Sequence, residues 1–199
     1  MSLRPHATRL PAARRRQQLL AVALEVFGEH GFHPTSMNDV AEAAGVTKPV
    51  LYQHFRSKRD LYRKVLTDVG GQLLEEITKA TAAATTPHQQ VELGFLAYFR
   101  WVAANEPAFR VLFGGGTRRD EEFAAQVAKV EGAIADAIAA LIEVQGFEHG
   151  QRRQLAHGLV GLAEGVSRLW MADGGEESPE ELAALVAGFA WNGLRGIHG

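Results

Sequence analysis

The spacing of apolar residues follows a helical period along almost the whole chain. One apolar stripe after Arg14 has the period of an amphipathic helix and consists of Leu19, Val22, Ala23, Val26 and Phe27. The period-two alternation that half-buried strands show extends nowhere over a useful length, and glycines and prolines fall at helix-sized intervals. The sequence therefore predicts an all-α fold.

The predicted helices group into a small N-terminal unit and a larger one. S-x-x-D sequences at Ser36 and Ser57 mark two helix starts, and Gly45 permits a tight turn between two short helices, the dimensions of a helix-turn-helix. The prediction is a flexible basic arm (1–13), a three-helix helix-turn-helix domain (14–66) and a larger helical ligand-binding and dimerisation domain (67–199). Helices are expected over residues 14–30, 37–44, 48–55, 58–84, 87–105, 107–113, 120–145, 149–172 and 179–194, with the glycines 114–116 in a loop.

Several classes of function lack the residues that they need. The chain has no cysteine, so a disulfide framework, a thiolate zinc site and a cysteine nucleophile are excluded. G-x-S-x-G, Walker A and H-E-x-x-H motifs are absent, and no acidic partner follows His30 and His33, so we expect no enzyme, metal or cofactor. No stretch approaches about 18 uninterrupted apolar residues, which excludes a membrane span. Without an apolar run of signal-peptide length, the protein is expected in the cytoplasm.

The charges are divided unevenly between the two units. Residues 1–66 hold 11 Lys or Arg and 5 Asp or Glu, a net charge of +6, whereas residues 67–199 carry a net charge of −8. Such asymmetry indicates an N-terminal end that faces nucleic acid and a different task for the remainder.

The segment from Thr35 to Leu66, TSMNDVAEAAGVTKPVLYQHFRSKRDLYRKVL, resembles the N-terminal DNA-binding domain of the TetR family of transcriptional repressors. The resemblance covers about residues 14–66 and rests on the S-x-x-D start, the A-x-x-A-G-V turn, L-Y-x-H-F and S-K-x-x-L, in that order. The remaining two thirds of the chain resembles the family in helix layout and length. The resemblance implies that double-stranded operator DNA is the partner of this segment.

The second short helix is the expected recognition helix. Its N-terminal residues must reach base edges in the major groove, and Lys48, Val50 and Gln53 lie opposite the inward-facing Leu51 and Phe55. Pro49, in the first turn of the same helix, belongs to the DNA-facing set. The family resemblance implies phosphate contacts by Ser36, Thr47, Tyr52, His54 and Lys58. The basic arm is expected either to reach the minor groove or to remain a solvated tail.

Two apolar stripes near the C-terminus indicate a helix–helix seam. The first consists of Leu155, Leu159, Leu162, Val166 and Leu169, with Gly158 and Gly161 along its edge, and the second of Leu182, Val186, Phe189 and Gly193. In family members the last two helices form a four-helix bundle across a two-fold axis, so the resemblance implies a homodimer. The alternative is that the seam closes the core of the single chain.

The larger unit also contains an aromatic-rich segment. The expected effector-binding residues are Phe95, Tyr98, Phe99, Phe109 and Phe113, because pockets for apolar ligands are lined in this way, although plain helix cores are too. The C-terminal stretches HGLVGLAEGVSRLW and AGFAWNGL are similar to regulators of fatty-acid synthesis that respond to long-chain acyl-CoA.

The prediction as a whole is a dimeric, ligand-responsive transcriptional regulator, in particular a repressor that an apolar small molecule, such as a fatty acyl-CoA, releases from a two-fold operator. The alternative is a helical carrier of an apolar small molecule whose N-terminal module does not bind DNA. Salt-dependent binding to duplex DNA separates the two, because only the regulator needs it.

Overall fold

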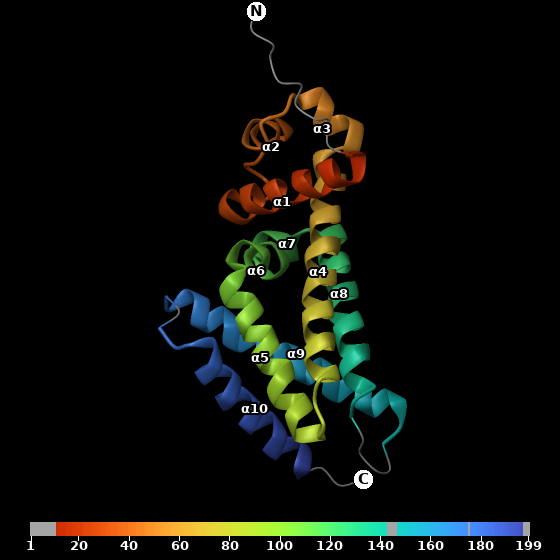
Figure 1. Ribbon diagram of the computed structural model, residues 1–199, viewed down its shortest axis with the longest axis vertical. Coiled ribbons are helices and arrows are strands. Elements are labelled where there is room, and N and C mark those ends of the chain that lie inside the picture. The colour runs from red at the N-terminus through yellow and green to blue at the C-terminus, as the bar shows by residue number, and fades with distance from the viewer. Residues whose placement is uncertain (1–10, 143–146, 175, 197–199) are drawn as a thin grey trace, which may run out of the picture.

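A computed structural model describes residues 11–142, 147–174 and 176–196 of the chain. These residues form helices and connecting turns without any strand, which confirms the all-α prediction (Figure 1). The helices are α1 (Ala12–His30), α2 (Met37–Ala43), α3 (Lys48–His54), α4 (Lys58–Ala82), α5 (Pro87–Ala104), α6 (Glu106–Phe113), α7 (Gly115–Arg119), α8 (Glu121–Ala139), α9 (His149–Ala172) and α10 (Pro179–Arg195).

Helices α1 to α3 form a small head at one end of an elongated molecule, and local signals set where they begin and turn (Figure 1). The Ser36 side chain accepts from the amides of Asn38 and Asp39, while the Asp39 carboxylate accepts from the Ser36 amide at 2.8 Å, which makes a capping box for α2. Gly45 has a φ of 63°, which glycine adopts without steric cost, and it turns the chain into α3.

Helix α4 connects the head to the rest of the protein, which we call the body. It has 25 residues, so it extends about 38 Å at 1.5 Å per residue. Its upper part packs on α1 and its lower part on α5 and α8. The domain boundary expected after residue 66 therefore falls inside a continuous helix, and head and body share a rigid element.

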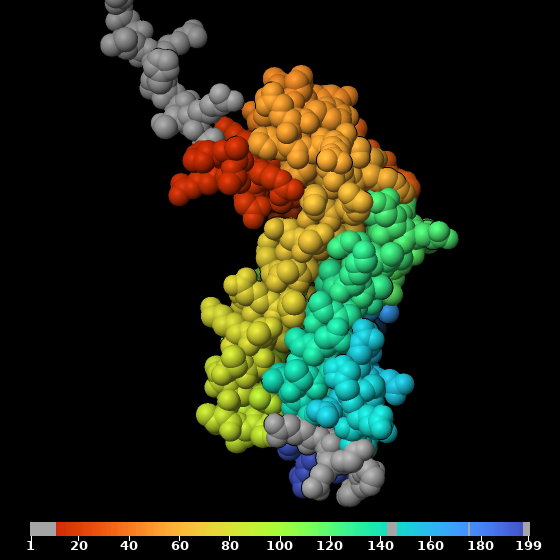
Figure 2. Space-filling model, turned by 90° about the vertical axis from the view of Figure 1, so that its right-hand side faces the viewer, coloured from red at the N-terminus to blue at the C-terminus, as the bar shows by residue number. Residues whose placement is uncertain are grey.

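The body packs α5 between α4 and α10, and packs α8 between α4 and α9. Figure 2 shows α4 and α8 running side by side along one face of the molecule, below the head. The pair lies close because Gly70 of α4 leaves no space for a side chain: a Cβ there would lie 2.4 Å from Val130 Cγ2 of α8.

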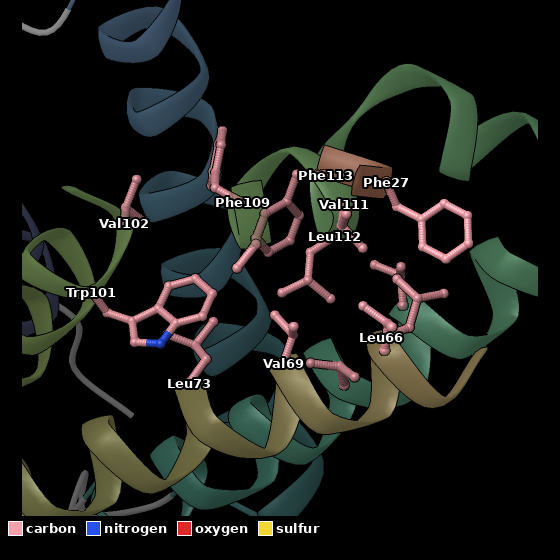
Figure 3. Close-up of a cluster of buried hydrophobic side chains, with 14 of the residues drawn as sticks. Phe27, Leu66, Val69, Leu73, Trp101, Val102, Phe109, Val111, Leu112 and Phe113 are labelled. Carbon is pink, nitrogen blue, oxygen red and sulfur yellow. The ribbon is translucent and has the colours of Figure 1, made fainter. Parts of the chain in front are cut away.

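Helix α6 fills the junction between head and body. Figure 3 shows Leu66, Val69 and Leu73 of α4 directed toward Val111 and Leu112 of α6, with other side chains of the same buried cluster around them.

The contact of α6 with the head is a close backbone approach. A Cβ on Gly28 of α1 would lie 2.6 Å from Pro107 Cβ of α6. Because tightly packed interiors shift as units, a displacement of α6 must also displace α1.

Three expectations about elements need correction or comment. The glycines at 114–116 are not simply a loop: Gly114 precedes α7, and Gly115 and Gly116 form its first turn. Their low helix propensity is overridden by tertiary contacts, because Thr117 of α7 is buried and donates to the Val111 carbonyl at 2.8 Å.

Helix α8 ends at Ala139, earlier than expected, and residues 143–146 lie outside the described residues. Residues 1–10 of the basic arm also lie outside them, whereas residues 12 and 13 belong to α1.

Candidate functional site

The exposed face of α3 carries the residues expected to meet DNA. Leu51 and the following Phe55 are buried, which fixes the inward side of this helix. Lys48, Pro49, Gln53 and Tyr52 are exposed, and His54 and Val50 are partly exposed. Tyr52 is 45% exposed, so its hydroxyl can reach a ligand on this face. The expected DNA-facing side of α3 is therefore on the surface, at the end of the molecule opposite the last turn of α10 (Figure 1).

Two hydroxyl groups flank this face. Thr47 precedes α3, is exposed, and makes no capping hydrogen bond, so its hydroxyl is available to a ligand. The Ser36 oxygen accepts from two amides at 3.2 Å, but its own proton remains for donation to an acceptor such as phosphate oxygen. The backbone hydrogen bond from Ser36 holds the pKa of the Asp39 carboxyl below its usual value. Asp39 therefore remains a negatively charged cap.

Lys58 does not fit the expected phosphate contact. Its Nζ donates to the carbonyls of Phe32 (2.8 Å), His33 (3.2 Å) and Thr35 (2.7 Å), and it lies 4.3 Å from the centre of the Phe32 ring. An ammonium group has three donors, and all three are used within the chain. Burial lowers the pKa of Lys58. We therefore assign Lys58 to holding the segment before α2, which positions Ser36, rather than to DNA itself.

A second set of contacts fastens the head to the body. Tyr62 of α4 is buried, and its hydroxyl lies 2.5 Å from the Thr117 hydroxyl of α7. Both hydroxyl groups are also within donating distance of the Val111 carbonyl, Thr117 at 2.8 Å and Tyr62 at 3.3 Å, so either can be the donor in this pair. Burial raises the pKa of Tyr62, so the phenol keeps its proton. Arg59 of α4 forms ion pairs with Asp120 and Glu122 at the start of α8.

The body contains an apolar cavity of about 410 Å³ between α4, α5, α8, α9 and α10, closed toward the head by α6. Of the five expected effector-binding residues, Phe95, Tyr98 and Phe113 line it. Phe99 and Phe109 do not: Phe99 is fully buried and packs against Trp170, and Phe109 packs against Phe113. These two rings pack in the core and do not line the cavity.

The cavity has two ends that differ in chemistry. The head-side end, which we define by Tyr98, Phe113, Glu131 and Glu164, lies next to α6 and α7, whereas the distal end includes Gln90 and Arg195, near the end of α10. Sequence reasoning missed Glu131, Glu164 and Arg195 as cavity residues. The available signal was a charged residue within an apolar helical stripe, such as Glu164 between Ala163 and Val166.

The charged groups at the head-side end are paired. Arg118 of α7 contacts both Glu164 of α9 and Glu131 of α8, the latter at 3.3 Å, and Arg168 lies 3.2 Å from Glu164. Burial, and then the charge of Glu164, raises the pKa of Glu131. Arg118 follows Thr117 in the chain, so one short helix contacts both the cavity wall and Tyr62 of α4.

An apolar face remains on the outside of α9 and α10. We call it the C-terminal face, and its large side chains are Leu169 (64% exposed), Leu185 (70%) and Phe189 (72%). The expected seam residues Gly158, Gly161 and Gly193 are also exposed. A Cβ at any of them would meet nothing within 4 Å in the single chain, so a second helix can approach closely here.

The remaining residues of the expected seam face inward. Leu182 and Val186 are buried in the chain's own core on the helix that packs along α5, so in the single chain they are not on the surface that a partner would meet. Four residues of the first stripe are half-buried and pack against the core of the single chain, as in the alternative in which the seam closes that core: Leu155, Leu159, Leu162 and Val166. Leu185 was missed, although it precedes Phe189 by four residues and therefore shares its side of the helix.

Among the residues that the structure describes, no three His, Cys, Asp or Glu side chains could hold a metal ion together. No described helix is long and apolar enough to cross a membrane.

Two family models match the chain. Residues 19–65 match bacterial regulatory proteins of the tetR family, and residues 87–193 match the tetracyclin repressor-like C-terminal domain. The first match covers most of the head and the upper part of α4. The second covers α5 to α9 and most of α10, the helices that carry the C-terminal face and that enclose the cavity together with the lower part of α4.

Similar proteins are regulators of transcription rather than enzymes. The transcriptional activator FasR of Mycolicibacterium smegmatis is 35% identical over 190 residues, which cover 94% of this chain and 85% of FasR. The repressor KstR2 of the same organism is 33% identical over 87 residues, which cover 44% of this chain and 42% of KstR2.

The fold is also found in solved structures. A TetR-like transcriptional regulator from Rhodococcus sp. RHA1 superimposes with a TM-score of 0.77 at 29% identity, covering 95% of this chain and all of that one. FadR of Bacillus subtilis, solved in complex with stearoyl-CoA, gives a TM-score of 0.75 at 19% identity, covering 92% and 99%. TetR-family regulators bind DNA operators, dimerise and bind small-molecule effectors. The chain belongs to the TetR family of ligand-responsive transcriptional regulators.

Proposed function

We propose that this protein binds a two-fold DNA operator as a homodimer and that an apolar effector, bound in the cavity of the body, releases it from that operator. The observation that carries the proposal is the cavity itself. It is lined mainly by apolar side chains, and Leu73 and Ile77 of α4 form part of its wall. A ligand that changes the position of α4 in the body therefore acts on the same rigid helix that holds the head.

The route from cavity to head has two parallel connections. One is α4, and the other is α7, where Arg118 contacts the cavity wall while its neighbour Thr117 binds Tyr62. Effector binding shifts the dimer toward whichever arrangement the effector binds more tightly. Because the two recognition helices must be about 34 Å apart to enter successive major grooves, a small rotation of each head is enough to lower operator affinity.

For the operator contacts we propose that Lys48, Val50 and Gln53 read bases and that Ser36, Thr47, Tyr52 and His54 contact phosphates. The exposure of these groups on one end of the head supports this assignment. Pro49 presents its ring on the same surface.

Substitution of Lys48 or Gln53 by alanine is expected to change the preferred base at particular operator positions. Each lost bidentate contact should lower operator affinity by about 1–3 kcal/mol, because lysine pairs with guanine and glutamine with adenine. Selection of bound sequences from random duplex DNA measures this directly. Tyr52→Phe is the matched control, since loss of a phosphate contact should weaken all sequences about equally. Unchanged base preference in both alanine variants would contradict the assignment.

For the effector we propose a long acyl chain, free or as its CoA thioester. The cavity is apolar over most of its wall, and its distal end includes Arg195, a cation suited to an anionic head group. The stearoyl-CoA complex of FadR shows that this fold can hold such a molecule. The similarity of the C-terminal stretches to acyl-CoA-responsive regulators points the same way.

Acyl chains of increasing length are expected to bind with steeply rising affinity until the cavity is full. Each buried CH₂ contributes roughly 0.8 kcal/mol, which is about a fourfold gain per carbon. Operator release, followed by fluorescence anisotropy of labelled DNA, should show the same length dependence as thermal stabilisation of the free protein. Phe95→Ala at the cavity wall should weaken the response, whereas Phe99→Ala should lower stability instead. A flat response across the series would remove the acyl proposal and leave the family assignment intact.

We propose that the protein is a repressor, the sign of control inferred from the sequence. Among its relatives FasR is named as an activator and KstR2 as a repressor. A reporter gene under the native promoter, compared with and without the protein, tests the repressor proposal.

A further inference from the structure

The head-side end of the cavity contains a buried polar group that the chain itself leaves unsatisfied. Tyr98 lines the cavity and is only 7% exposed, yet its hydroxyl has no hydrogen-bond partner. Burial raises the pKa of Tyr98, and the Ser167 hydroxyl partly offsets this rise as a hydrogen-bonding neighbour, but these two buried hydroxyl groups do not form a hydrogen bond of good geometry. Buried hydroxyl groups are nearly always hydrogen-bonded, because leaving one unpaired costs free energy.

Strong acceptors lie beside this hydroxyl. The carboxylates of Glu131 and Glu164 line the same end of the cavity, and both interact electrostatically with Tyr98. Arg118 contacts one oxygen of each carboxylate. A carboxylate has about four acceptor positions, so hydrogen-bonding capacity remains after these contacts.

We propose that the head-side end of the cavity binds a hydroxyl group at the far end of the effector, so that the preferred effector is an apolar chain with a terminal hydroxyl. The inference rests on the proposed function, in which an apolar chain occupies this cavity. A hydroxyl fits because it can donate to the Glu131 carboxylate while accepting from Tyr98. A terminal methyl would leave Tyr98 unpaired, and a terminal carboxylate would face two glutamates. The anionic end of the effector then lies distally, toward Arg195.

The test compares fatty acids with their ω-hydroxy counterparts in matched pairs of ten, twelve and fourteen carbons. In an apolar pocket the added hydroxyl lowers affinity, because it is buried without a partner. In this cavity it should raise affinity about tenfold at the length that reaches Tyr98, as expected for a hydrogen bond that involves a charged group. Isothermal titration calorimetry on the full chain measures the affinity of both acids of each pair. The sign of the difference in affinity decides whether the cavity prefers the terminal hydroxyl.

Two variants test whether the preference for the ω-hydroxy acid arises at Tyr98. Tyr98→Phe removes only the hydroxyl oxygen and leaves Glu131 in place, so it should reduce the preference for the ω-hydroxy acid severalfold while binding the plain acid at least as well as before. Ile138→Ala, at a cavity position on α8 away from Tyr98, should weaken both acids and leave their ratio unchanged. Thermal melts of both variants confirm that they fold.

Three results would overturn the inference. The first is that plain acids bind as tightly as their ω-hydroxy partners at every length. The second is that Tyr98→Phe keeps the full preference for the ω-hydroxy acid. Both of these results leave the proposed function standing. Failure of both series to bind would overturn the inference together with the acyl effector on which it rests.

Discussion

Replacement of Gly161 by leucine is expected to convert the protein from a dimer to a monomer. A side chain at this position meets nothing within 4 Å in the single chain, and leucine favours helix more than glycine does. The substitution should therefore leave the protomer as stable as before or more stable. The leucine can prevent dimer formation only if a second chain packs closely against α9. We propose that the C-terminal face is the surface on which the second chain packs.

Phe189→Glu tests the same face from α10. Because Phe189 is 72% exposed in the single chain, the charge costs the protomer little, but in a two-fold interface it would be buried together with its symmetry mate. Operator affinity should fall by a factor of 10² to 10⁴, because a monomer loses the effective concentration that a linked second head provides. Analytical ultracentrifugation gives the oligomeric state, and circular dichroism shows that the protomer remains helical.

Lys79→Glu is a suitable control for both variants. It is an exposed position on α4, away from the C-terminal face, and it changes the charge by more than Phe189→Glu does. This variant should remain dimeric. Dimers in both Gly161→Leu and Phe189→Glu would show that the interface lies on another surface.

Lys58→Met is expected to lower the melting temperature by about 5–10 °C and to weaken operator binding without altering its salt dependence. Methionine keeps the apolar stem that packs near Phe32 but removes the ammonium that holds three carbonyls. Loss of these bonds should destabilise the head by roughly 2–3 kcal/mol, given that hydrogen bonds to charged groups contribute about 1.5–3 kcal/mol each and this group is partly exposed.

The slope of log affinity against log salt distinguishes the structural role of Lys58 from a phosphate contact. A lysine that neutralises a phosphate contributes about one unit to that slope, whereas a lysine that holds the loop before α2 contributes none. Lys64→Met, at an exposed position one and a half turns further along α4, is the matched control and should leave the melting temperature nearly unchanged. A normal melting temperature combined with a reduced slope in Lys58→Met would restore the phosphate assignment.

Local signals in the sequence were sufficient for the starts of α2 and α4 and for the turn before α3. Ser36 and Ser57 begin α2 and α4 because a side-chain oxygen satisfies amide groups that have no partner in the first turn of a helix. Gly45 fixes the turn before α3 because few other residues tolerate its positive φ. These are interactions between residues at most a few positions apart, so the sequence contains all of the information that they require.

Only the tertiary structure decided what each apolar or charged residue faces. An apolar stripe has the same spacing whether it packs on its own chain or on a partner, and α10 does the first through Leu182 and Val186 and presents Leu185 and Phe189 to the outside. Phe95 lines the cavity while Phe99, one turn later, is core. The amino group of Lys58 is occupied by carbonyls 23 to 26 positions away. Periodicity sets the direction of a side chain relative to its own helix, but its surroundings depend on how the other helices are arranged around it.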